Sequence, residues 1–260
     1  MGWLYFLHVR DRRFNDDQYR IVAIVQNTSD ADALKTVYLA ELLDLSLDKP
    51  VNIYYFNLQK ATEKLLNHPL IKEATIKKIL PGTLYIDYQM RTPIAYIGEL
   101  SNTAIDHEGY LIPFHPFYTP KRLPTLYLNI DSKESQWGKS IYQHPSIQQA
   151  FNLLKKWNTL FGRTDNIKQI DVSMIGADSY GQRQAVVIVE EIAFDDKTKL
   201  NSPLFYLRLS SDHTEQDLSN FHFFQEAMKV NKELRVYEGK NLEIDFRIPN
   251  LAYIKASSSS

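Results

Sequence analysis

Residues 52–93 read NIYYFNLQKATEKLLNHPLIKEATIKKILPGTLYIDYQMRTP, and this stretch decides the fold. Its opening, residues 52–56, predicts a short strand, and Asn57 is a suitable N-cap for a following helix. Pro69 ends that helix, because a proline disfavours helical backbone in the residue before it. The apolar residues recur at helical spacing: Leu58, Ala61, Leu65 and Leu66.

Two strand-like runs follow, residues 71–80 and 83–90, and they flank Pro81-Gly82. This dipeptide favours a tight turn, so the runs predict a β-hairpin. Upstream, residues 19–26 alternate as a half-buried strand does, and Ser29 or Asp30 can cap the next helix. The broad apolar face of that helix is formed by Ala33, Leu34, Val37, Tyr38, Ala40, Leu42 and Leu43. The resulting order, strand-helix-helix-strand-strand, predicts a small sheet covered on one face by two helices.

Beyond residues 98–102 the pattern changes to many strands with few helices. It begins with a hairpin over residues 104–112 around an Asp-His-Glu-Gly turn. A helix is expected over residues 146–161, ended by Gly162, and another over 217–230. The other predicted strands cover residues 167–174, 184–192, 204–210, 242–248 and 251–255.

Composition excludes several classes of protein. The 260 residues, 44% hydrophobic, are enough for two modest cores, so two domains are expected. The formal charge is -1, from 30 basic and 31 acidic residues. This balance gives no sign of the basic surface that a nucleic-acid-binding protein needs, so that class is set aside. The absence of cysteine excludes thiol nucleophiles, zinc ribbons and disulfides, and it leaves the cellular compartment open.

No motif predicts a catalytic, cofactor-binding or metal site. The nearest approach to a nucleophile elbow is A-D-S-Y-G at 177–181, which lacks the first glycine and lies between strands, so Ser179 is interpreted as a loop serine. His68 is interpreted as a helix-end contact favoured by the helix dipole, because no two histidines have helical ligand spacing. The polar residues 106–108 are interpreted as turn residues.

Three segments resemble the bacterial cell-division family FtsQ/DivIB: the block up to Pro93, the turn at 106–109, and the strand Ile-Asp-Phe-Arg at 244–247. The resemblance implies an α+β fold, with a small POTRA domain (β-α-α-β-β) followed by a mixed, mainly antiparallel β-domain with two flanking helices. Leu70 and Met90 depart from the family pattern, as does the absence of glycine after the first strand.

The resemblance also implies the domain ranges and the location. Residues 1–18 would be a membrane-proximal segment at the end of a truncated transmembrane helix, 19–98 the POTRA domain, 99–256 the β-domain and 257–260 a disordered tail. The apolar Gly2–Val9 run is too short to span a bilayer, and an ordinary strand or helix start remains the alternative. The implied location is the bacterial inner (plasma) membrane, single-pass, with the bulk of the chain extracytoplasmic (periplasmic) at the division septum.

The implied function is a non-enzymatic scaffold that binds FtsB/DivIC-like and FtsL-like division proteins, with no cofactor, nucleic acid or small-molecule substrate. The last strand is expected at a sheet edge, where a partner strand can add, although twist and a lysine can also protect such an edge. The candidate partner-binding residues are Phe246, Arg247, Leu251, Ala252, Tyr253, Ile254 and Lys255. Two alternatives are a POTRA-bearing chaperone or transport module of the outer-membrane assembly or secretion type, and a hydrolase with a dispersed site.

Overall fold

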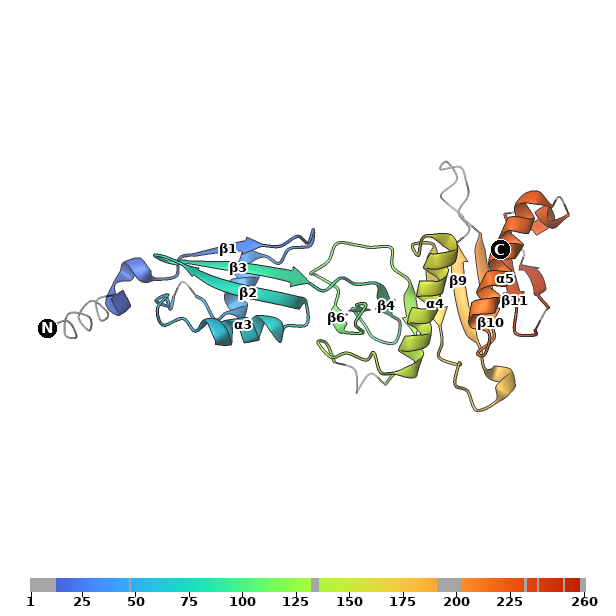
Figure 1. Ribbon diagram of the computed structural model, residues 1–260, viewed down its shortest axis with the longest axis horizontal. Coiled ribbons are helices and arrows are strands. Elements are labelled where there is room, and N and C mark those ends of the chain that lie inside the picture. The colour runs from blue at the N-terminus through green and yellow to red at the C-terminus, as the bar shows by residue number, and fades with distance from the viewer. Residues whose placement is uncertain are drawn as a thin grey trace. The chain divides into compact units, whose positions relative to one another are not determined.

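A computed structural model describes residues 13–46, 48–131, 136–190, 203–231, 233–237, 239–249 and 251–257 (Figure 1). The chain divides into two compact units. The first comprises Met1–Thr92 and Ile112–Thr119, and the second comprises Pro93–Leu111 and Pro120–Ser260. The expected domain ranges, 19–98 and 99–256, stay predictions.

The first unit is a three-stranded sheet with two helices packed against it (Figure 1). Its elements are β1 (Ala23–Asn27), α2 (Thr36–Leu42), α3 (Leu58–Leu66), β2 (Ile71–Ile79) and β3 (Thr83–Met90). The strand order is β1-β3-β2, with β1 parallel and β2 antiparallel to β3. The predicted order of elements and the predicted hairpin are therefore confirmed.

The helix and hairpin that follow Asn57 form as their local sequence predicts. The Asn57 side chain accepts a hydrogen bond from the backbone nitrogen of Lys60 at 3.0 Å, so it caps α3. The helix ends at Leu66, before Pro69. Alternate residues of β3 are buried, as a half-buried strand requires: Leu84, Ile86, Tyr88 and Met90.

The predicted strand at residues 52–56 is wrong, because this segment is a turn. The Asn52 side-chain oxygen accepts from the backbone nitrogen of Tyr54 at 2.9 Å, and its carbonyl accepts from the nitrogens of Tyr55 and Phe56. A single β-bridge joins Asn52 to Arg20. An asparagine that bonds the backbone two residues on favours a turn over an extended strand, and here it outweighs the β-propensity of the aromatic run.

The start of the first helix also differs from the prediction, because neither Ser29 nor Asp30 caps it. Helix α2 begins after Lys35, which makes no side-chain cap. The Asp30 carboxylate instead accepts from the backbone nitrogen of Met90 at 2.6 Å, so it ties this loop to the end of β3. The Tyr88 hydroxyl accepts from the backbone nitrogen of Leu34 at 2.9 Å, which fixes the same loop a second time.

The second unit is built on a mixed sheet, in the order β12-β11-β10-β9-β8-β7-β4-β5-β6. Neighbouring pairs β12/β11, β10/β9, β9/β8 and β4/β5 are antiparallel, whereas β11/β10, β8/β7 and β7/β4 are parallel. The strands are β4 (Ala95–Ile97), β5 (Thr103–Ile105), β6 (Leu111–Pro113), β7 (Thr125–Tyr127), β8 (Ile167–Asp171), β9 (Ala185–Glu190), β10 (Leu204–Leu209), β11 (Asn241–Asp245) and β12 (Tyr253–Ser257). Of β6, only Leu111 belongs to the second unit.

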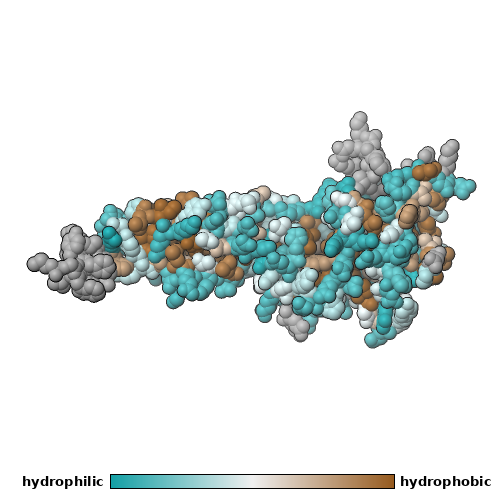
Figure 2. Space-filling model, viewed as in Figure 1, coloured by the Kyte–Doolittle hydropathy of each residue, from teal (hydrophilic) through white to brown (hydrophobic). Residues whose placement is uncertain are grey.

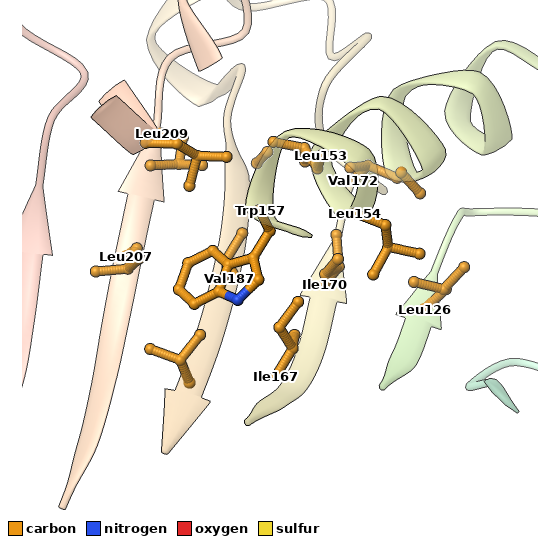
Figure 3. Packing of buried hydrophobic residues seen from close by; sticks show 14 of the residues in the cluster. Leu126, Leu153, Leu154, Trp157, Ile167, Ile170, Val172, Val187, Leu207 and Leu209 are labelled. Carbon is orange, nitrogen blue, oxygen red and sulfur yellow. The ribbon is translucent and has the colours of Figure 1, made fainter. Parts of the chain in front are cut away.

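Helices α4 (Pro145–Phe161) and α5 (Thr214–Val230) pack against each other and contribute to one core with this sheet. Figure 3 shows Trp157 of α4 among side chains of the strands beneath it. Its indole nitrogen donates to the side-chain oxygen of Asn166 at 3.1 Å, so the polar atom of this buried ring is satisfied. Gly162 follows α4 with φ of 70°, as the predicted helix stop requires.

Short 3₁₀ helices complete the described elements: η1 (Asp17–Tyr19), η2 (Tyr180–Gln182) and η3 (Leu234–Tyr237). The predicted 19–26 strand is shorter in the structure, because Tyr19 belongs to η1 and β1 begins at Ala23. The side chain of Asp16 accepts from the backbone nitrogen of Gln18 and caps η1.

Candidate partner-binding edge

Strand β12 stands at one end of the sheet order of the second unit. It pairs with β11 in antiparallel register, with Tyr253 opposite Asp245 and Lys255 opposite Glu243. In the part of the chain that the structure describes, no strand pairs with the outer side of β12. The last strand therefore has the edge position that partner addition requires.

The hydrogen bonds of β11 indicate which backbone groups of β12 face away from the sheet. The Phe246 nitrogen donates to the Arg208 carbonyl of β10 at 2.9 Å. Backbone groups of successive strand residues point to opposite sides, so Asp245 directs its nitrogen and carbonyl toward β12. The backbone nitrogen and carbonyl of its partner Tyr253 accordingly point back to β11. The backbone groups of Ile254 and Ala256 point away from the sheet.

Side chains of β12 alternate between the core and the opposite face of the sheet. Ile254 is partly buried against the hydrophobic core, whereas Tyr253 is 64% exposed and Lys255 is exposed. Ile248 and Leu251, in the connection before β12, are exposed as well. An apolar contact surface thus lies beside the outward backbone groups.

The predicted partner-binding residues do not all reach the surface. Leu251 and Ala252 are exposed, as are the Tyr253 and Lys255 side chains, and Ile254 contributes its backbone. Phe246 is buried in the core, directly after the last residue of β11. Its alternation with the charged residues around it is visible in the sequence, but its burial depends on the helices above the sheet.

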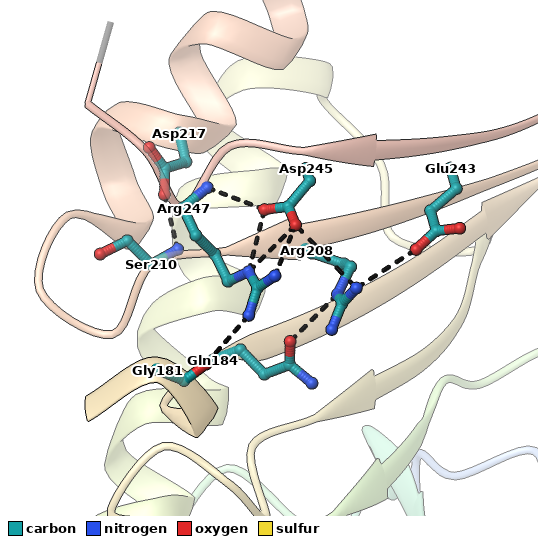
Figure 4. Close-up of polar contacts among 8 residues, drawn as sticks. All are labelled: Gly181, Gln184, Arg208, Ser210, Asp217, Glu243, Asp245 and Arg247. Atoms are coloured by element: carbon teal, nitrogen blue, oxygen red, sulfur yellow. Dashed lines mark hydrogen bonds and ion pairs between the residues drawn. The ribbon is translucent and has the colours of Figure 1, made fainter. Parts of the chain in front are cut away.

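Arg247 takes part in a polar network on the sheet face opposite the core (Figure 4). Its guanidinium donates to both carboxylate oxygens of Asp245, at 2.9 and 2.7 Å, and to the Gly181 carbonyl at 3.3 Å. From β10, Arg208 adds a donor to Gln184 at 3.1 Å and an ion pair with Glu243 at 3.4 Å. The network joins β11 to β10 and to the residue before β9.

Charge in this network sets the protonation of Asp245. Burial raises the pKa of that carboxyl, but the hydrogen bonds and charge of Arg247, with the charge of Arg208, outweigh burial and lower the pKa. The hydrogen bond from Arg247 to Asp245 raises the pKa of the guanidinium in turn. Sequence reasoning missed Arg208, Gln184 and Glu243. Arg208 on β10 and Gln184 before β9 are far from β11 in the sequence, so no spacing rule joins them to it.

The other residues singled out from the sequence are held in structural roles. Ser179 lies at the start of η2, where its side chain makes no capping bond. The Asp106 carboxylate accepts from the nitrogens of Glu108 and Tyr110, which confirms its role in the turn. Within the described residues, no group of histidine, cysteine, aspartate and glutamate side chains is arranged to hold a metal ion.

His68 follows the C-cap of α3, so it stands at the helix end as interpreted, and its contacts there favour the neutral ring. Its Nε2 lies 2.8 Å from the Tyr38 hydroxyl, and its Nδ1 accepts from the Leu70 nitrogen at 3.3 Å. Because Nδ1 is an acceptor, the neutral ring carries its proton on Nε2. Burial lowers the pKa of His68, so the neutral form is favoured.

The apolar run Gly2–Val9 lies outside the described residues. Among the helices that the structure does describe, none has both the length and the hydropathy needed to cross a membrane. The predicted membrane-proximal segment and its truncated transmembrane helix are therefore proposals.

Comparison with known proteins supports the resemblance to the FtsQ/DivIB family. The model of the POTRA domain, FtsQ-type, matches residues 31–88, which lie in the first unit. The chain is 27% identical over 129 residues to cell division protein DivIB of Clostridium acetobutylicum, covering 49% of this chain and 50% of that protein. It is 26% identical over 122 residues to cell division protein DivIB of Clostridium tetani, covering 46% and 45%.

The fold and these matches are those of a protein whose first unit resembles a POTRA domain and whose second unit is built on a larger β-sheet. The matches support an FtsQ/DivIB-type division protein. The matched region spans about half the length of the curated relatives.

Proposed function

We propose that this chain is a non-enzymatic scaffold of bacterial cell division that binds partner proteins at the β12 edge. The family match supports a role in division, since both relatives are named cell division proteins. The proposed location is the plasma membrane at the septum, single-pass, with the bulk of the chain extracytoplasmic. FtsB/DivIC-like and FtsL-like proteins are the proposed partners.

The position of β12 at the end of the sheet is the observation that carries this proposal. A partner segment in extended conformation can add to the edge through the outward backbone groups of Ile254 and Ala256. Tyr253 then supplies an exposed aromatic anchor, and Leu251 adds apolar area before the strand. The charged face formed by Arg208, Asp245 and Arg247 lies beside this edge, where it can select the charge pattern of the partner.

Replacing Ala256 by proline tests the edge directly. Proline removes the outward nitrogen donor of residue 256 and leaves the hydrogen bonds of Tyr253 and Lys255 to β11 in place. We expect the affinity for the FtsB/DivIC-like protein of the same bacterium, measured by calorimetry, to fall about tenfold or more. Tyr253→Lys should weaken binding comparably, because it removes the anchor ring.

Ala256→Ser is the matched control, because it keeps the backbone donor at the same exposed position. It should bind like the unsubstituted chain, and circular dichroism should show the same fold for all three variants. Equal affinity of folded Ala256→Pro, Tyr253→Lys and Ala256→Ser variants would place the docking surface away from β12.

A further inference from the structure

Three separate segments meet at one end of the first unit, which we call the amino-terminal tip and define as residues 13–22, 51–56 and 79–83. The Ile21 nitrogen donates to the Val51 carbonyl at 2.9 Å, and the Val22 nitrogen donates to the Gly82 carbonyl at 2.9 Å. A Cβ on Gly82 would clash with the Arg20 carbonyl oxygen, so the hairpin turn lies directly against the entering chain. Figure 1 shows this turn and the start of the described chain at the same end of the unit.

Four large apolar side chains of the tip are exposed to solvent. The exposed fractions are 80% for Val22, 65% for Tyr55, 57% for Leu80 and 47% for Ile79. Hydrophobic residues gather toward this end of the unit on the face that Figure 2 shows. Single exposed apolar side chains are ordinary, but a group at one end of a domain indicates an interaction surface.

Aromatic rings line the same tip. The Phe14 ring lies 4.5 Å from Tyr55 and 5.9 Å from Tyr54, and the Tyr19 and Tyr54 rings are 5.1 Å apart, centroid to centroid. Tyrosine combines an apolar ring with a hydroxyl that stays hydrated, which suits the headgroup level of a bilayer. Exposed charges of both signs border the rings: Arg13, Asp16, Asp17, Arg20 and Lys49.

We propose that the amino-terminal tip rests on a lipid bilayer surface, with Val22, Ile79 and Leu80 entering the boundary between headgroups and acyl chains. The residues just before the tip support lipid as the occupant. Gly2–Val9 reads Gly-Trp-Leu-Tyr-Phe-Leu-His-Val, and only four residues separate Val9 from Phe14. An apolar run with a tryptophan and a tyrosine, as is typical of membrane interfaces, and an apolar, tyrosine-bearing tip are thus adjacent in the chain.

This inference deepens the proposed membrane location and shares no residue with the β12 edge. It adds that the folded POTRA unit itself contacts lipid, beyond any anchor in the preceding residues. Such contact would restrain the unit against the membrane, because two attachments limit its rotation where one alone would not. A failure of β12 docking leaves this proposal standing, and the reverse also holds.

A fluorescent label at position 80 tests the contact. The chain has no cysteine, so Leu80→Cys can carry a single environment-sensitive nitrobenzoxadiazole label. With vesicles of phosphatidylcholine, alone or mixed with phosphatidylglycerol, its emission should shift to the blue and be quenched by nitroxide-labelled lipids. The matched control is Val37→Cys, at a residue of α2 that is also exposed. Its neighbour Thr36 accepts a hydrogen bond from Gln26, near the end of β1 that is farther from the tip. The label at position 37 should not respond.

Paired aspartate substitutions provide the second measurement. Ile79→Asp with Leu80→Asp should lower vesicle affinity about tenfold or more, because two apolar side chains no longer leave water. Val37→Asp should leave it unchanged, and circular dichroism should show that all variants are folded.

Three results would overturn the proposal. The chain could fail to bind either kind of vesicle. It could sediment with vesicles while the label at 80 stays unchanged, which would assign binding to other residues. The label could instead respond to protein concentration without vesicles, which would assign the tip to a second copy or a protein partner.

Discussion

The contact between Tyr38 and His68 shows how a single side chain acquires a role that its sequence position does not reveal. The imidazole lies between the Tyr38 hydroxyl and the Leu70 nitrogen, and Tyr38 also stacks edge-on against it with centroids 5.6 Å apart. Burial lowers the pKa of His68 and raises that of Tyr38, so both groups stay neutral near neutral pH. The pair joins α2 to the turn after α3.

This contact predicts a pH dependence for the stability of the first unit. A histidine whose folded pKa is below its unfolded value contributes stability that is complete above the unfolded value, about 6.5, and is lost as pH falls through the folded pKa. Between pH 7 and 5, the free energy of unfolding measured by urea titration should fall more for the unsubstituted chain than for His68→Gln.

The physical reason is that a proton on Nδ1 removes the acceptor for the Leu70 nitrogen and charges a partly buried ring. His107→Gln is the matched control, because His107 is exposed in a turn, and it should retain the full pH dependence. Equal pH profiles for the His68→Gln variant and the unsubstituted chain would contradict the assignment of this loss to His68.

At the scale of elements, the ends of α4 are set by residues adjacent to them, whereas the start of α2 is not. Helix α4 has proline in its first turn, an accepting His144 side chain at its N-cap, and Gly162 at its end. Helix α2 has no such cap and is held instead by tertiary contacts of the preceding loop. Helix α4 is therefore delimited by residues at its own ends, whereas the start of α2 depends on residues far away in the sequence.

Gly162→Ala tests the end of α4. Gly162 has φ of 70° and open space where the Cβ of another residue would lie, so alanine meets only backbone strain. We expect a loss of about 1 kcal/mol in the free energy of unfolding of the second unit, followed by tryptophan fluorescence in urea.

Gly176→Ala is the matched control, because Gly176 also has open space around it but does not have a positive φ. Stability there should stay unchanged or rise by up to about 1 kcal/mol, since alanine restricts the unfolded chain. Equal losses at both positions would show that the left-handed backbone is not the cause.

At the scale of the whole molecule, each unit has its own buried residues, and the core of the second unit joins both helices to the sheet. Phe221 of α5 lies 5.9 Å from Trp157 of α4 and 5.7 Å from Phe205 of β10, centroid to centroid. It thus connects the two helices to β10, which β11 separates from the β12 edge.

Phe221→Ala should destabilise the second unit by about 3–5 kcal/mol in urea unfolding, because a fully buried ring is replaced by a cavity. Phe223→Ala is the matched control on the same helix: Phe221 is 0% exposed and Phe223 is 72% exposed. The control should change stability by no more than about 0.5 kcal/mol. A small effect at both positions would mean that this ring does not connect the layers.

The sequence by itself determined the features that a few adjacent residues encode. These include the Asn57 cap, the hairpin at Pro81-Gly82, the Asp106 turn and the end of α4 at Gly162, and with them the order of elements and the α+β class. Each depends on backbone preferences or hydrogen bonds within about four residues, so pattern reasoning reaches it.

Only the tertiary structure decided which distant residues meet. In the folded chain, β1 is parallel to β3, and the Asp30 carboxylate bonds the Met90 nitrogen instead of capping a helix. Residues 52–56 form a turn in the amino-terminal tip. The tertiary structure also buried Phe246 and placed Arg208 beside Asp245 at the candidate edge. These outcomes depend on pairing between segments far apart in the chain, where the free energy of burial and of satisfying buried polar groups outweighs local propensity.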